Sequence, residues 1–298
     1  MSDNARGALL LAFTMGLFAS SDTLMKLALR HMPVGQILAM RGAIIFALLL
    51  GWLLWRRRAG NLQGCLDRFN LLRAFSEAAT AVAFFMGLAR LPLAVCSVVL
   101  FTAPLIMTAV AAFGLGERVS WRRWAAVLVG FVGVLFVARP QGAWSFALLF
   151  PFVAAVFVSV RDLMTRYVDP RLDAAAVGLT TACAVGLVGL ATLPLGALTP
   201  LAPAWTAPPP HILGLVTLSS LAIALAYVTI VAAYRLGEAS FLSPFRYSTI
   251  PFALVFGALV FGERHGAVTL FGAAVVVASG LLLFERGRGR PELRPRAP

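Results

Sequence analysis

Charged side chains interrupt the long apolar runs of this sequence at a few points. Asp22 and Lys26 stand in the first run, Glu77 in a later one, and Arg246 in a run near the end of the chain. A carboxylate in such surroundings binds an ammonium ion or a proton, and a guanidinium binds a carboxylate or phosphate through two parallel hydrogen bonds. These residues predict charge recognition in an apolar setting.

The segment around Asp22 has two interpretations. Asp22 and Lys26 are one helical turn apart, so they can form a local ion pair in which Lys26 reaches outward. Alternatively, Asp22 belongs to a polar patch with Ser20, Ser21 and Thr23, of which Ser20 and Thr23 share a helix face. The sequence leaves both interpretations open.

Glu77 and Arg246 each have a structural and a functional interpretation. Glu77 either pairs with Arg73, four residues earlier, or forms a proton or cation site. Arg246 lies five residues before Pro251, roughly 7.5 Å along a helix, where a guanidinium cannot easily reach a surface. It predicts a bound carboxylate or phosphate, with Glu77 as the alternative partner. Arg41 is a weaker candidate, because its helix can face lipid or a second copy of the chain.

Two prolines stand inside apolar runs and predict helix kinks. Pro104 and Pro251 each remove a backbone hydrogen bond and free the carbonyl four residues earlier, at Leu100 and Tyr247. Because side chains able to bind a solute surround both prolines, we expect the two kinks to line a cavity. These neighbours are Phe101, Thr102, Arg246 and Tyr247.

The remaining candidates have more ordinary roles. Tyr227 is expected to contribute to the same cavity, and Tyr234 to anchor at a membrane interface. Glu117 and Glu263 stand beside arginines in tight turns, which predicts helix caps or ion pairs. Three phenylalanines are expected to pack, with contact to an aromatic ligand as the alternative: Phe84, Phe85 and Phe157.

The elements that carry these residues are too apolar for a soluble fold. Of the 298 residues, 60% are hydrophobic and 12% are charged, and the mean hydropathy is +0.90. A soluble domain needs a charged surface that this composition cannot supply. The net charge of +13 comes from short clusters between apolar runs, so we expect a lipid bilayer and no nucleic acid as the partner. Three scattered cysteines and three scattered histidines indicate no disulfide framework and no metal site.

The apolar runs predict ten transmembrane helices, since about 20 apolar residues cross the hydrocarbon core. We expect the first run to belong to the fold, although it resembles a signal peptide. The expected spans are 7–29, 33–55, 70–90, 93–114, 121–138, 142–160, 172–193, 211–234, 239–261 and 266–284.

Lysine and arginine placement predicts the orientation of these spans. With the first residues in the cytoplasm, eighteen Lys and Arg fall in cytoplasmic segments and four in outer ones. The positive-inside rule therefore predicts that both termini are cytoplasmic. The link 194–210, which contains six prolines and no charged residue, is then extracytoplasmic.

The second half of the chain repeats the first. Gly116-Glu117-Arg118 matches Gly262-Glu263-Arg264, and the prolines 104 and 251 match at nearly the same offset. Because each half holds five expected helices, an odd number, the second half must enter from the opposite side of the membrane. The sequence thus predicts an inverted repeat of residues 1–140 and 141–285, followed by a basic cytoplasmic tail, 286–298. Inverted repeats suit alternating access to a site at their interface.

These motifs resemble the EamA-type pattern of the drug/metabolite transporter superfamily, over nearly the whole chain from about residue 7 to 285. The resemblance implies an all-α membrane protein with ten helices, two inverted five-helix repeats and cytoplasmic termini. It is carried by Leu91-Pro92-Leu93-Ala94, by Pro104, by Gly116-Glu117-Arg118-Val119-Ser120-Trp121-Arg122-Arg123-Trp124 and by Gly130-Phe131-Val132-Gly133-Val134-Leu135.

The expected function is therefore transport of a small metabolite across a bacterial-type inner membrane. The resemblance suggests the amino-acid exporter branch, with drug-type or S-adenosylmethionine permeases of the same superfamily as the alternative. A membrane-embedded enzyme is the rival of another class, but the sequence has no nucleophile motif, phosphate loop or histidine-rich cluster. We expect no cofactor and no catalytic residue. The expected substrate-binding residues are Ser20, Asp22, Thr23, Glu77, Phe101, Thr102, Tyr227, Arg246 and Tyr247, with Pro104 and Pro251 as kinks.

Overall fold

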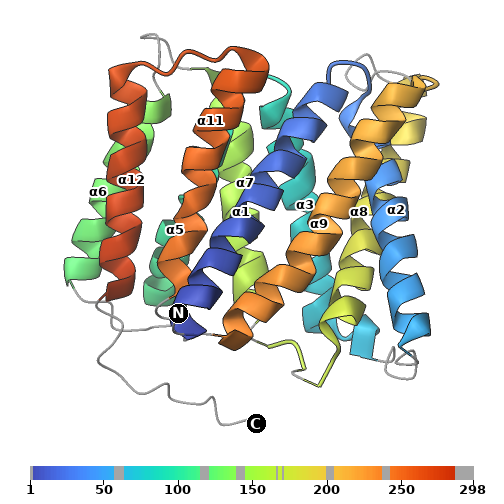
Figure 1. Cartoon of the computed structure of the whole chain (residues 1–298), viewed down its shortest axis with the longest axis horizontal. Helices are drawn as coiled ribbons and strands as arrows, with labels where there is room; N and C mark the ends of the chain where they lie inside the picture. Colours follow the sequence, from blue (N-terminus) through green and yellow to red (C-terminus); the bar gives the residue numbers. More distant parts are fainter. Residues whose placement is uncertain are drawn as a thin grey trace.

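The computed structural model describes residues 3–56, 64–114, 121–138, 145–165, 167–169, 171–198, 205–236 and 242–285. Every regular element in these ranges is a helix, and the long helices run roughly side by side (Figure 1). In the first half they are α1 (Asp3–Ala28), α2 (Val34–Trp55), α3 (Arg68–Leu88), α4 (Leu93–Leu100), α5 (Ala103–Gly114) and α6 (Trp121–Ala138).

The second half contains a similar series of helices. It comprises η2 (Phe146–Leu148), α7 (Leu149–Thr165), α8 (Ala174–Leu198), α9 (Pro210–Leu236), η3 (Ser243–Ser248), α11 (Thr249–Phe261) and α12 (Ala267–Glu285). Within the described ranges, six segments are long and apolar enough to cross a membrane, and four apolar helices are shorter. The first residues of α1 and the last of α12 lie at the same end of the bundle (Figure 1).

Two of the expected spans are not continuous α-helices. The span 93–114 breaks at Phe101 and Thr102, between α4 and α5, just before Pro104. The described part of the span 239–261 begins with the 3₁₀ helix η3 and becomes α-helical at Thr249, just before Pro251. Proline cannot donate the hydrogen bond that would continue an α-helix through these points, so both interruptions follow from the sequence.

Side-chain placement is the reverse of that in a soluble protein. Large apolar side chains cover the outside: Phe113 is 82% exposed, Leu259 78% and Leu128 64%. Serine and threonine side chains lie in the interior, and the hydroxyl groups of Ser21 and Ser219 are 2.7 Å apart between α1 and α9. An apolar exterior of this extent is stable only against lipid.

The helix pairs follow a regular exchange between the two halves of the chain. Helix α1 of the first half packs against α9 and α11 of the second half. Correspondingly, α7 of the second half packs against α3 and α5 of the first half. Two further pairs join helices at matching places in the two halves: α2 with α8, and α6 with α12.

Glycines permit the closest of these contacts. A Cβ atom built on Gly42 of α2 would lie 2.5 Å from the Cα of Gly186 on α8. A Cβ on Gly133 of α6 would lie 2.9 Å from the carbonyl oxygen of Gly272 on α12. The backbones approach at these points because neither side chain is present, as in other small-residue contacts of membrane helices.

Candidate functional site

A cavity of about 1940 Å³ lies between the two halves of the bundle. It is lined by α1, α2, α3, α7, α8 and α9 and by the segments at the two helix breaks. Its lining includes Arg56, which follows α2, and Asp169 and Asp173 in the link between α7 and α8. The cavity therefore extends to the end of the bundle at which α1 begins (Figure 1).

Most of the predicted site residues line this cavity, and four do not. Asp22, Glu77, Phe101, Pro104, Tyr227, Arg246 and Tyr247 line it. Ser20 donates instead to the carbonyl oxygen of Gly16, at 2.8 Å, and Thr23 donates to that of Ala19, at 2.7 Å. Thr102 is fully buried and donates to the carbonyl oxygen of Val99 at 2.7 Å. Pro251 is exposed and does not line the cavity, so its effect is on the helix backbone alone.

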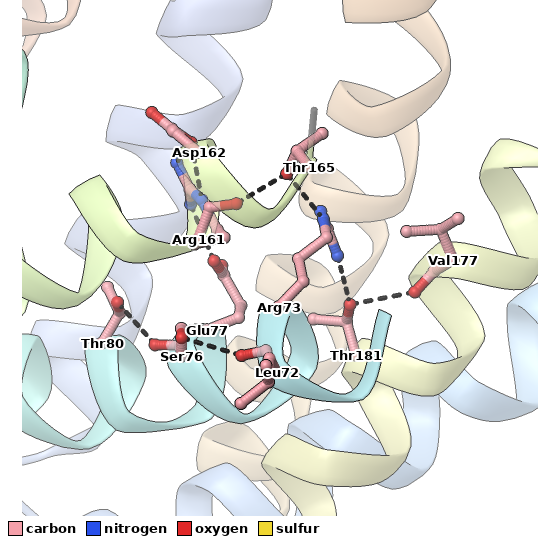
Figure 2. A network of polar contacts seen from close by, with 10 residues as sticks. All are labelled: Leu72, Arg73, Ser76, Glu77, Thr80, Arg161, Asp162, Thr165, Val177 and Thr181. Atoms are coloured by element: carbon pink, nitrogen blue, oxygen red, sulfur yellow. Dashed lines mark hydrogen bonds and ion pairs between the residues drawn. The ribbon is translucent and has the colours of Figure 1, made fainter. Parts of the chain in front are cut away.

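Glu77 is held by Arg161 of α7, and not by Arg73 as the local spacing suggests. The Arg161 Nη1 atom lies 2.7 Å from Glu77 Oε2, and Arg161 Nη2 lies 2.8 Å from Asp162 Oδ1 (Figure 2). Arg73 donates to the hydroxyl groups of Thr165 and Thr181 at 3.1 and 2.7 Å. Because α3 packs against α7, Arg161 reaches Glu77 from the neighbouring helix. Glu77 is therefore not the partner of Arg246 either.

A second ion pair lies at the opposite end of the bundle. Lys26 Nζ lies 2.6 Å from Glu263 Oε1 and donates to the carbonyl oxygen of Leu91 at 2.8 Å. The predicted Asp22–Lys26 pair does not form. Glu263 follows Gly262, whose φ of 64° ends α11 and turns the chain. The same Glu263 oxygen accepts from the backbone N–H of Leu93 at 2.9 Å, as expected of a helix cap, although its charged partner is Lys26 and not Arg264.

Besides Arg56 at the end of α2, three charged side chains in the cavity have no such partner. Asp22, Arg41 and Arg246 make no side-chain hydrogen bond or ion pair with any residue that the structure describes. Arg41 contacts the ring of Phe85, with its guanidinium carbon 5.3 Å from the ring centroid. Unpaired charge is costly inside a membrane, so these three groups are the ones available to a charged solute.

Aromatic rings form part of the cavity wall. The rings of Phe101 and Tyr247, at the two helix breaks, have centroids 5.0 Å apart and are tilted by 36°. Tyr227 makes an edge contact with Phe18 across 6.4 Å. Phe84 and Phe85 also line the cavity, whereas Phe157 is not part of its lining. The side chain of Tyr234 and all of Glu117 lie outside the part of the chain that the structure describes.

Sequence reasoning ranked Arg41 as a weaker candidate and missed Arg161. Arg161 was expected in a cytoplasmic link, but α7 continues to Thr165 and carries Arg161 into the bundle. A signal was present, because the segment 159–166 resembles 20–26 and therefore predicts an equivalent place in the fold. No group of three metal-binding side chains occurs among the residues described.

Comparison with known proteins agrees with this architecture. Residues 5–139 match the EamA-like transporter family. A riboflavin transporter of Rhizobium johnstonii is 28% identical over 76% of this chain and 72% of its own length. An S-adenosylmethionine uptake transporter of Rickettsia bellii is 22% identical over 66% of this chain and 65% of its own length.

Two further matches extend over nearly the whole chain. The pseudopaline exporter CntI of Pseudomonas aeruginosa is 24% identical over 95% of this chain and 97% of its own length. A protein of known crystal structure shares the fold at 17% identity, with a TM-score of 0.67 over 95% of this chain and 98% of that one. The family and the relatives point to a transporter and not to an enzyme. The chain is therefore a multi-pass inner-membrane protein whose first half, residues 5–139, matches the EamA-like transporter family.

Proposed function

We propose that the protein is a secondary transporter that exports a small carboxylate-bearing metabolite, such as an aromatic amino acid, by alternating access. The observation that carries this proposal is the large cavity with three unpaired charged side chains, Asp22, Arg41 and Arg246. A structural membrane protein gains nothing from unpaired charge in its interior. A transporter needs such groups to recognise a polar solute.

The helix contacts support an inverted repeat. An axis that exchanges the halves 1–140 and 141–285 converts the α1–α9 pair into the α7–α3 pair and leaves α2–α8 and α6–α12 in place. Phe101 and Tyr247, at the two helix breaks, contact each other where the two halves meet.

The cavity at one end of the bundle and the ion pair at the other end support alternating access. The cavity extends to the end that holds Arg56 and Arg73, which the positive-inside rule assigns to the cytoplasm. At the other end the Lys26–Glu263 pair joins α1 to the turn after α11 and, through Leu93, to the start of α4. In this proposal ten helices cross the membrane, both termini are cytoplasmic, and the cavity opens to the cytoplasm.

A larger substrate is the alternative within the same class. The cavity volume of about 1940 Å³ exceeds the needs of an amino acid. The relatives named as riboflavin and S-adenosylmethionine transporters favour a ring-bearing solute of that size. The aromatic residues Phe84, Phe101 and Tyr247 would contact its ring system.

Counterflow in liposomes that contain only this protein tests the proposal. Vesicles are loaded with unlabelled L-phenylalanine, riboflavin or S-adenosylmethionine, and entry of the same labelled compound is followed. We expect labelled L-phenylalanine to accumulate transiently, and riboflavin or S-adenosylmethionine in its place if the alternative holds. Empty liposomes are the control. Absence of counterflow for every compound would contradict the transporter assignment, and product formation without flux would favour a membrane-embedded enzyme.

A further inference from the structure

Asp22 and Arg41 lie at the same depth in the membrane, near the closed end of the cavity. Asp22 stands six residues before the end of α1 at Ala28, and Arg41 seven residues after the start of α2 at Val34. At 1.5 Å per residue these offsets are about 9 and 10 Å. The short link 29–33 joins the two helices at this end, so the two offsets are measured from the same level.

The two side chains carry opposite charges and are not bonded to each other. Neither forms a hydrogen bond or ion pair within the described part of the chain. The contact with Phe85 covers one face of the Arg41 guanidinium and leaves the N–H groups on its edge available. Glu77 and Arg161, which also line the cavity, differ in this respect because they neutralise each other at 2.7 Å.

We propose that Asp22 and Arg41 bind the amino-carboxylate head of a zwitterionic substrate, with its ammonium group on Asp22 and its carboxylate on Arg41. This inference rests on the proposed transport function and names the class of its substrate. A zwitterion adds no net charge to a region of low dielectric constant, and it gives each protein charge a partner. A solute with only a carboxylate would leave Asp22 unpaired, and one with only an amine would leave Arg41 unpaired.

Arg246 takes a different part in this arrangement. It stands fifteen residues before the end of α11 at Phe261, about 24 Å from the closed end, and so lies about 14 Å nearer the open end than Arg41. A substrate carboxylate that enters from the open end therefore meets Arg246 before it reaches Arg41. Arg41 is the cation that holds the carboxylate while Asp22 holds the ammonium group.

Binding of three related compounds to the purified protein tests this assignment. L-phenylalanine has both charges, 3-phenylpropanoate lacks the ammonium group, and 2-phenylethylamine lacks the carboxylate. By titration calorimetry the wild type is expected to bind L-phenylalanine at least tenfold more tightly than either analogue. Asp22→Asn should bind 3-phenylpropanoate as well as L-phenylalanine, and Arg41→Gln should do the same for 2-phenylethylamine.

Controls separate a binding role from a folding role. Arg6→Gln removes the same charge from an exposed residue at the start of α1, where Arg6 pairs with Asp3, and should leave all three affinities unchanged. Size-exclusion profiles and unfolding temperatures establish that the variants fold. If one of them does not, the neutral double variant D22N/R41Q should fold and should show no preference among the three compounds.

Two results would overturn the inference. One is an unchanged preference for L-phenylalanine in folded Asp22→Asn and Arg41→Gln proteins. The other is a wild type that carries out counterflow of riboflavin but binds neither L-phenylalanine nor S-adenosylmethionine. In that second case the transporter function stands and only the substrate class falls, whereas loss of all counterflow contradicts the transporter function itself.

Discussion

Lys26 and Glu263, 237 positions apart in the sequence, form an ion pair of 2.6 Å that joins the two halves of the chain at the closed end of the bundle. The side chains are only 14% and 12% exposed, and Lys26 also lies 4.8 Å from the centroid of the Phe261 ring. The pair therefore stands between the cavity and the far side of the membrane. In the proposed alternating-access cycle, the pair separates before that side opens.

Arg246→Ala is expected to lower flux of a carboxylate-bearing substrate at least tenfold while the protein still folds. Arg246 has no bonded side-chain partner among the described residues, so its removal leaves no buried charge of the protein uncompensated. Arg246→Lys should restore only part of the flux, because an ammonium group carries the charge but cannot donate the two parallel hydrogen bonds of a guanidinium. Liposome flux and detergent-extracted stability are measured together. Normal flux in a folded Arg246→Ala protein would remove this residue from the site.

Arg161 and Glu77 are expected to differ sharply in their effect on stability. Arg161→Met leaves both Glu77 and Asp162 without their partner and should lower the free energy of unfolding by about 3 kcal/mol or more. Glu77→Gln leaves Arg161 paired with Asp162 and should cost about 1 kcal/mol. Unfolding in detergent measures both. Equal losses of unfolding free energy in the two variants would contradict the central role of Arg161 in this ion-pair network.

Because α2 and α8 are in tight contact, one added methyl group between them is expected to destabilise the protein. A Cβ atom on Gly189 would meet the backbone N of Ala39 and lie 2.6 Å from the carbonyl oxygen of Gly35. Gly189→Ala should therefore destabilise the protein by about 1–3 kcal/mol. Gly51→Ala is the matched control, since a Cβ there meets nothing within 4 Å. A Gly189→Ala protein as stable as Gly51→Ala would mean that the two backbones are farther apart.

Membrane orientation is tested with single cysteines in a background that lacks Cys65, Cys96 and Cys183. Trp205→Cys should react with an impermeant thiol reagent in intact cells, and Arg290→Cys should react only after the cells are opened. The reason is the excess of Lys and Arg in the segments assigned to the cytoplasm. Reaction of Arg290→Cys in intact cells would reverse the orientation.

The sequence predicts the helices better than it predicts the partners of their charged side chains. Apolar runs long enough to cross a membrane identify the helices without knowledge of tertiary contacts. The prolines likewise locate both helix breaks. These features depend on local sequence.

Charge partners depend on distant packing. The spacing offers Glu77 a neighbour in Arg73 and offers Asp22 a neighbour in Lys26, but the bonded partners are Arg161 and Glu263. Arg41 presents a related difficulty. Its helix is apolar nearly all round, so periodicity does not reveal which face meets the cavity.

Two-sided accessibility of one cavity position tests alternating access most directly. Ala81 of α3 lines the cavity, and Ala81→Cys in the cysteine-free background is labelled in vesicles of known orientation. We expect labelling from the cytoplasmic side in the parent protein. In the K26M/E263Q background, which lacks the ion pair without leaving a lone buried charge, labelling from the outer side should rise at least tenfold. Arg264→Gln, at an exposed neighbour of Glu263, should leave both rates unchanged. Outer labelling that stays at background in folded K26M/E263Q protein would contradict the account.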